Sequence, residues 1–249
     1  MIDLLKPPVT VDPNRDTSRY VRSYLIMRVF IGSLAIALPF MLVLGDGIGF
    51  GADPFPRGSL SSYFFSGTRE IFVGTLCATA VFLITYKVAE RNLDNTLSVL
   101  AGIAVLAVAM FPTNPPRNAD LTPLQERLGE SVVATIHYIS AATFIGSLAV
   151  ISYFFGKREG RRPPREGKRS PEFWKRYHQL CAAAIAAAIA WIILTELAGG
   201  VPRGLLYGEI VAVVAFGLSW LMKGLELDIL RGTRASTSAP PPVPNGPAS

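Results

Sequence analysis

Glutamate recurs in the first turn of apolar stretches of this sequence, at Glu70, Glu130 and Glu209. A carboxylate near a helix N-terminus meets unpaired backbone N–H groups and the positive end of the helix dipole, which stabilises the helix by about 0.3–1 kcal/mol. Helix capping is the simpler interpretation. The alternative is that the carboxylates surround a cavity, because ionisable groups at membrane depth usually face the interior of a bundle.

Other charged side chains could complete such a site. Glu209 is the strongest candidate because its sequence neighbours on both sides are apolar. Glu196, near the end of the preceding apolar stretch, could join it. Arg69, next to Glu70, is the counter-charge that we expect for the carboxylates.

Histidine and serine offer proton-transfer chemistry. His137 lies about two turns into an apolar stretch, where it predicts either a hydrogen bond to a neighbouring helix or a base or proton relay. Ser61 belongs to a serine-rich segment whose hydroxyls suit caps and turns. As a nucleophile it would need a base in reach, and His137 could serve only if this segment folds inward. His178 is expected at the opposite membrane interface.

Motifs for cofactors are missing from the sequence. We find no phosphate-binding glycine loop, zinc-ligand cluster or haem motif, so we expect neither a cofactor nor a metal.

Six apolar stretches must position these residues. Only 17% of the 249 residues are charged, against about 25% in soluble domains, and half are hydrophobic. A bilayer-spanning helix needs roughly 20 mainly apolar residues. We therefore predict an all-α polytopic membrane bundle of six transmembrane helices, which fall at about 23–45, 70–87, 96–112, 131–155, 179–198 and 205–222.

The distribution of Lys and Arg predicts the orientation. With the N-terminus in the cytoplasm, the inner segments hold eighteen basic residues and the outer segments five, and Arg28 lies inside a span, where it is expected to snorkel. Positive charge is retained on the cytoplasmic side. Both termini are therefore expected in the cytoplasm, and the protein in a bacterial inner membrane.

The predicted organisation has three parts: a cytoplasmic segment 1–22, a transmembrane domain 23–225 and a disordered cytoplasmic tail 226–249. The lipid bilayer is the expected partner, and nucleic acid is not. The basic inner loop 157–176 is explained by topology, although it could also bind anionic lipid. The outer loops 46–69 and 112–130 are expected to fold back as a partial lid.

Several segments carry a family resemblance: residues 61–74 (SSYFFSGTREIFVG), 111–113 (FPT), 137–141 (HYISA) and 215–224 (AFGLSWLMKG). Together they resemble a family of uncharacterised six-span bacterial membrane proteins. The resemblance implies the fold and no reaction. The entry to the second span is also similar to that of the membrane hydrolases that include alkaline ceramidases, but those use seven spans and three zinc-binding histidines.

Three functions remain open from the sequence. The first is an accessory, sensor or structural membrane component, with a membrane protein as partner, since no complete catalytic set is visible. The second is a small transporter or channel with an outward-facing vestibule of carboxylates and His137. The third is an enzyme that acts on lipid headgroups at the outer leaflet. A site should open outward between the second, fourth and sixth spans.

Overall fold

The computed structural model describes residues 13–49, 56–85, 93–117, 119–164 and 169–225. In these ranges the chain is helical and contains no strand. The predicted disorder of the tail 226–249 concerns residues outside this description. The first helix begins at Pro13, ten residues before the expected start of the first span, so part of the segment 1–22 is helical.

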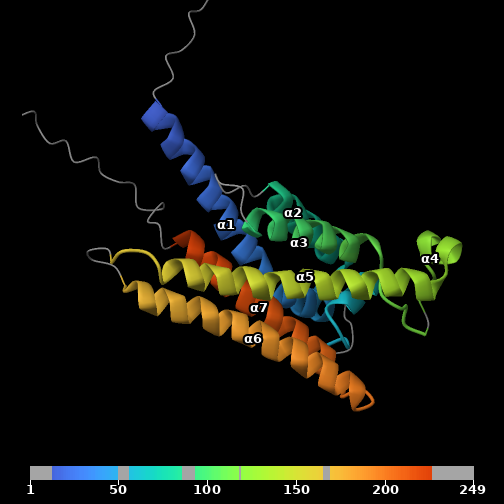
Figure 1. Ribbon diagram of the computed structural model, residues 1–249. Helices are drawn as coiled ribbons and strands as arrows, with labels where there is room; N and C mark the ends of the chain where they lie inside the picture. The colour runs from blue at the N-terminus through green and yellow to red at the C-terminus, as the bar shows by residue number, and fades with distance from the viewer. Residues whose placement is uncertain (1–12, 50–55, 86–92, 118, 165–168, 226–249) are drawn as a thin grey trace, which may run out of the picture.

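Six long helices make up the fold (Figure 1). They are α1 (Pro13–Leu44), α2 (Arg69–Thr85), α3 (Leu93–Met110), α5 (Glu130–Glu159), α6 (Pro171–Leu197) and α7 (Gly204–Leu225). Three short elements join them: a π-helical turn η1 (Gly45–Gly49), a 3₁₀ turn η2 (Ser61–Phe65) and α4 (Pro123–Leu128).

The long helices close into a ring. α1 packs against α2 and α7, α3 packs against α2 and α5, and α6 packs against α5 and α7. The start of α1, the end of α7 and the turn between α5 and α6 lie together at what we call the terminal end (Figure 1). The opposite, distal end carries η1, η2, α4 and the turn between α6 and α7.

Length and hydropathy make four segments capable of crossing a membrane: Ile26–Gly49, Glu130–Glu159, Pro171–Leu197 and Gly204–Lys223. The 17-residue α2 and the 18-residue α3 are shorter. At 1.5 Å per residue they extend over about 26 and 27 Å, close to the hydrocarbon thickness of about 30 Å. The molecule is therefore an all-α protein with four candidate spans, and the count of six stays a prediction.

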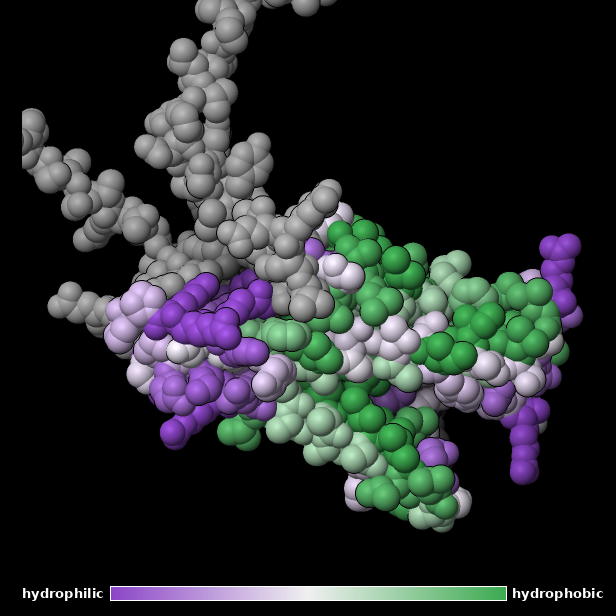
Figure 2. Space-filling model, in the orientation of Figure 1, coloured by the Kyte–Doolittle hydropathy of each residue, from purple (hydrophilic) through white to green (hydrophobic). Residues whose placement is uncertain are grey.

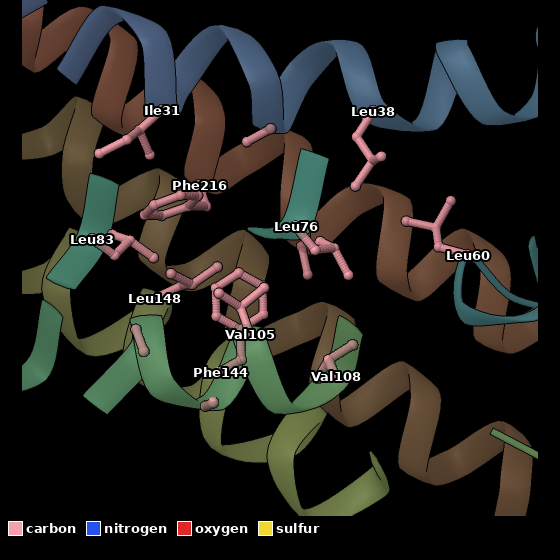
Figure 3. Close-up of a cluster of buried hydrophobic side chains, with 14 of the residues drawn as sticks. Ile31, Leu38, Leu60, Leu76, Leu83, Val105, Val108, Phe144, Leu148 and Phe216 are labelled. Atoms are coloured by element: carbon pink, nitrogen blue, oxygen red, sulfur yellow. The ribbon is translucent and has the colours of Figure 1, made fainter. Parts of the chain in front are cut away.

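Apolar side chains from the six helices fill the middle of the ring (Figure 3). Ile31 of α1, Leu148 of α5 and Phe216 of α7 are buried side chains at its centre. Leu60 joins this core from the segment before η2. The distal loop is therefore attached to the bundle by burial of its own side chain.

The first and last long helices touch through their backbones. A Cβ atom at Gly32 would lie 2.6 Å from the backbone nitrogen of Leu221 and 2.8 Å from the carbonyl oxygen of Gly217. No side chain fits between them. Such small residues are what helix pairs in lipid use to approach closely.

Hydrophilic surface gathers at the terminal end of the visible face, and hydrophobic surface covers most of its middle (Figure 2). The loop between α5 and α6 is shorter than the predicted 157–176, because α5 continues to Glu159 and α6 begins at Pro171, with Ser170 as its N-cap. Lys175 and Arg176 therefore belong to α6, where both pair with Glu172.

One expectation for the terminal end is wrong. Arg28 does not snorkel outward but is buried, with its guanidinium 5.2 Å from the centre of the Phe155 ring. His178 is fully buried in the bundle, and its Nδ1 lies 2.9 Å from the hydroxyl of Ser219. Neighbouring helices supply polar and aromatic partners that the local sequence does not reveal.

Candidate functional site: a crevice at the distal end

A cavity of about 440 Å³ opens at the distal end of the bundle, between α5, α6 and α7. In the space-filling view a notch separates the distal end of α5 from that of α6 (Figure 2). A volume of 300–1,000 Å³ is typical of sites for small ligands. We call this cavity the distal crevice.

Helix α5 lines the crevice with one face. His137, Ala141 and Ile145 follow each other at intervals of four residues, and Tyr138 and Ala142 stand beside them. This spacing places side chains above one another on one helix face. The α5 wall is therefore polar at the distal end and apolar deeper in the bundle.

The walls from α6 and α7 have the same polarity gradient. Glu196 lies one turn from Ile192 and Ile193 and two turns from Ile189. On α7, Leu205 and Glu209 line the crevice with a spacing of four residues. Two carboxylates thus stand near the distal end, above a wall of isoleucines.

The distal loops complete the lining. Ser59 and Ser61 come from the segment before α2, and Thr113 comes from the segment after α3. All three are buried. Both outer loops that the sequence analysis considered as a lid therefore contribute hydroxyl groups to this cavity.

Glu209 does not stand in the first turn of its helix, contrary to the sequence-based expectation. Helix α7 begins at Gly204, because Arg203 has a positive φ of 59° that interrupts the preceding turn. Instead of capping α7, Glu209 accepts a hydrogen bond at Oε2 from the backbone N–H of Leu60, at 2.6 Å. The carboxylate tethers the loop before α2 to the last helix.

Further hydrogen bonds fix the same loop. The backbone N–H of Leu206 donates to the carbonyl of Gly58 at 3.1 Å, and Nε of Arg203 donates to the carbonyl of Pro56 at 3.1 Å. Tyr63, in η2 of the same loop, is buried, and this burial raises the pKa of its phenol above the ordinary value. These hydrogen bonds hold the loop in place as part of the crevice wall.

His137 is held by the backbone of α3's C-terminal exit. Its Nδ1 lies 2.7 Å from the carbonyl oxygen of Phe111. A carbonyl only accepts hydrogen bonds, so Nδ1 carries the proton, and in the neutral ring Nε2 is an acceptor. Next to it, the hydroxyl of Tyr138 bonds to that of Thr113 at 2.9 Å. Gln125 of α4 donates to the Thr113 carbonyl at 3.1 Å.

The sequence candidates divide into two groups. Ser61, His137, Glu196 and Glu209 line the distal crevice together. Glu70 and Arg69 do not. Both are exposed at the start of α2, and Arg69 places its guanidinium 4.3 Å from the centre of the Phe64 ring. The cavity therefore lies between α5, α6 and α7, whereas the sequence predicted an opening between the second, fourth and sixth spans.

The crevice opens sideways between α5 and α6. Tyr138 is 49% exposed and Ile193 is 53% exposed, although both line the cavity. A second, shallower pocket lies against its distal side and includes Glu196 and Arg203. A ligand has two routes: a lateral one past apolar helix surfaces and a distal one past polar loops.

A charged cluster at the terminal end was missed by the sequence analysis. Glu159 is 1% exposed, forms an ion pair with the buried Lys223 of α7, and pairs with Arg162 at 3.2 Å. The available signal was an acidic residue at position 159 that stands among Lys157, Arg158, Arg161 and Arg162.

No three His, Cys, Asp or Glu side chains lie close enough to hold a metal ion within the described part of the chain.

Comparisons with family models, with curated protein sequences and with solved structures gave no match. The geometry of the crevice therefore carries the functional inference.

Proposed function

We propose that this chain crosses a bacterial inner membrane six times, with both ends in the cytoplasm, and binds a membrane amphiphile in the distal crevice as a sensor or accessory component. In this orientation the distal end faces outward. The supporting observation is the lateral opening between α5 and α6 into a cavity that is polar at its distal end and apolar below. A bilayer amphiphile has the same order of polar and apolar parts.

Blocking the crevice tests this proposal. Ala142 lines the lateral opening, whereas Ala190 is exposed on α6 outside it. The full chain, purified in neutral detergent, is incubated with dodecanol and with dodecyltrimethylammonium, and bound molecules are counted by native mass spectrometry. We expect binding to the wild type and to Ala190→Trp, and its loss in Ala142→Trp. Equal binding to all three proteins, or none to any, would contradict the proposal.

A second candidate is hydrolysis of an ester in a lipid headgroup, favoured by the presence of Ser61 and His137 in one cavity. His137 Nε2 would accept the Ser61 proton as the Ser61 oxygen attacked the ester carbonyl, and would return it to the departing alcohol. Water would then release the acid and restore Ser61. A fluorophosphonate probe should label the wild type and Ser59→Ala but not Ser61→Ala. An unlabelled wild type rejects this candidate.

A further inference from the structure

The charged groups that line the distal crevice are acidic. Glu196 and Glu209 are its carboxylates, and no Lys or Arg of the described chain lines it. Neither glutamate forms an ion pair with a described basic residue. Arg203 lies at the distal mouth and donates Nε to the carbonyl of Pro56. Arg57, in the same loop, pairs with Asp46 at 2.8 Å.

Glu209 has one carboxylate oxygen to spare. Its Oε2 accepts the N–H of Leu60 at 2.6 Å, and no other hydrogen bond to this side chain occurs within the described residues. Glu209 is half-buried, and a carboxylate partly removed from bulk water is costly unless charge and hydrogen bonds compensate it. A ligand that brings a positive charge to this oxygen therefore gains more than a neutral one.

The crevice also offers an aromatic ring to such a charge. Tyr138 stands at the lateral opening, and its hydroxyl is fixed by Thr113 at 2.9 Å. Ammonium groups are attracted to the negative faces of aromatic rings. Arg and Lys would repel the same group, and none of the described lining residues is either.

Below the carboxylates the lining is apolar. From Glu196 to Ile189, and from His137 to Ile145, the walls descend by seven and eight residues. At 1.5 Å per residue this is a depth of about 10–12 Å. An alkyl chain fits such a wall, and its remainder can leave through the lateral opening into lipid.

The geometry points to an amphiphile with one ammonium head as the ligand of the distal crevice. The head lies between Glu196 and Glu209, and the chain lies along the isoleucines of α5 and α6. This inference rests on the proposed function and specifies the charge of the ligand. Ammonium lipids and free organic cations share the head chemistry, and the hydrocarbon chain distinguishes them.

Three probes share a dodecyl chain and differ in the charge of the head: dodecyltrimethylammonium, dodecanol and dodecyl sulfate. A fourth probe, tetramethylammonium, carries the positive head without the chain. Each is titrated against the full chain in neutral detergent. We expect dodecyltrimethylammonium to bind at least ten-fold more tightly than the other three. Tetramethylammonium binding as tightly would assign the crevice to free cations and reject an amphiphile.

Two variants connect the preference to the carboxylates. Glu209→Gln keeps an oxygen for the Leu60 N–H. Glu196 is exposed and its side chain makes no hydrogen bond or ion pair within the described chain, so Glu196→Gln leaves the fold intact. Each should weaken dodecyltrimethylammonium at least ten-fold and leave dodecanol unchanged. Glu126→Gln, on the exposed face of α4, is the matched control and should change neither.

The outcomes separate the two proposals. If all three dodecyl probes bind equally and Ala142→Trp blocks them, the crevice binds amphiphiles and the inference about charge is wrong. Preference for dodecyl sulfate also overturns it. If Ala142→Trp abolishes the binding of none of the probes, the proposed function itself is wrong. Equal weakening by Glu126→Gln would assign the effect to overall charge and reject the site.

Discussion

A buried ion pair joins α5 to α7 at the terminal end. Glu159 is 1% exposed and Lys223 is 4% exposed, and Arg162 provides a second, more accessible cation. Desolvation of two charges offsets much of their attraction, but removal of one partner leaves the other buried and uncompensated. The pair therefore matters most when it is broken on one side.

Lys223→Met should lower the free energy of unfolding by up to about 3–5 kcal/mol, because Glu159 loses its buried partner and keeps only the more accessible Arg162. The double variant Glu159→Met/Lys223→Met should regain most of this loss, because neither charge then remains. Denaturant unfolding of the purified chain in detergent measures both.

The matched control is Lys175→Met, which removes the exposed partner of Glu172. Pairs at the surface contribute about 0–1 kcal/mol, so this change should be small. A double variant no more stable than Lys223→Met alone would show that packing of the lysine stem, and not charge, explains the loss.

Some of the helix–helix contacts in this bundle require glycine, because no side chain fits between the two helices. At Gly32 the nearest atoms of α7 are backbone atoms, which cannot rotate away as a flexible side chain can. Gly74 on α2 differs, because nothing lies within 4 Å of the position that a Cβ would take. The two glycines allow a direct comparison.

Gly32→Ala should separate α1 from α7 and destabilise the chain by about 1–3 kcal/mol, the usual cost of overpacking. Gly74→Ala should be neutral or stabilise by up to about 1 kcal/mol, because alanine is the better helix former. Thermal unfolding in detergent compares the two variants with the wild type. Equal stability of both variants would exclude a tight α1–α7 seam.

Element boundaries were predicted best where glycines, which readily end a helix, follow an apolar stretch closely. The distal end of α6, at Leu197, agrees with the prediction to one residue. Its terminal end does not, because Trp174 and His178 pack inside and extend α6 back to Pro171. The start of α7 at Gly204 agrees with the predicted 205 to one residue, and the expectation of Glu209 in its first turn is wrong because Glu209 lies five residues further along.

The orientation of the whole molecule is testable with single cysteines in a chain without Cys77 and Cys181. Asn114 is exposed at the distal end, and Arg161 is exposed between α5 and α6. In intact cells an impermeant maleimide should label Asn114→Cys, whereas Arg161→Cys should react only after the membrane is opened, because the positive side stays in the cytoplasm.

The count of six spans depends on α2 and α3, the two shorter helices. In intact cells Arg91→Cys, between them in the sequence, should not react with the impermeant maleimide, whereas Gly58→Cys at the distal end should react. Labelling of both positions from outside would mean that α2 and α3 do not cross, and the chain would have four spans.

The candidate site could be predicted from the local sequence only in part. Glu209 and His137 could be selected because charged and titratable groups in apolar stretches are costly and need a reason. Their shared cavity could not be predicted, because it depends on which helices are neighbours in the ring. Glu70 satisfies the same local rule but lies on an exposed face of α2.

The closed ring has a consequence for biosynthesis. Helix α1 leaves the ribosome before the other described helices, yet much of its packing surface is on α7, the last of them to be made. Until α7 arrives, the glycine seam of α1 faces lipid or an insertion factor, and the Leu60 amide lacks its Glu209 acceptor. Chains truncated before α7 should therefore be recognised as incomplete and degraded, because their first helix still lacks its main partner.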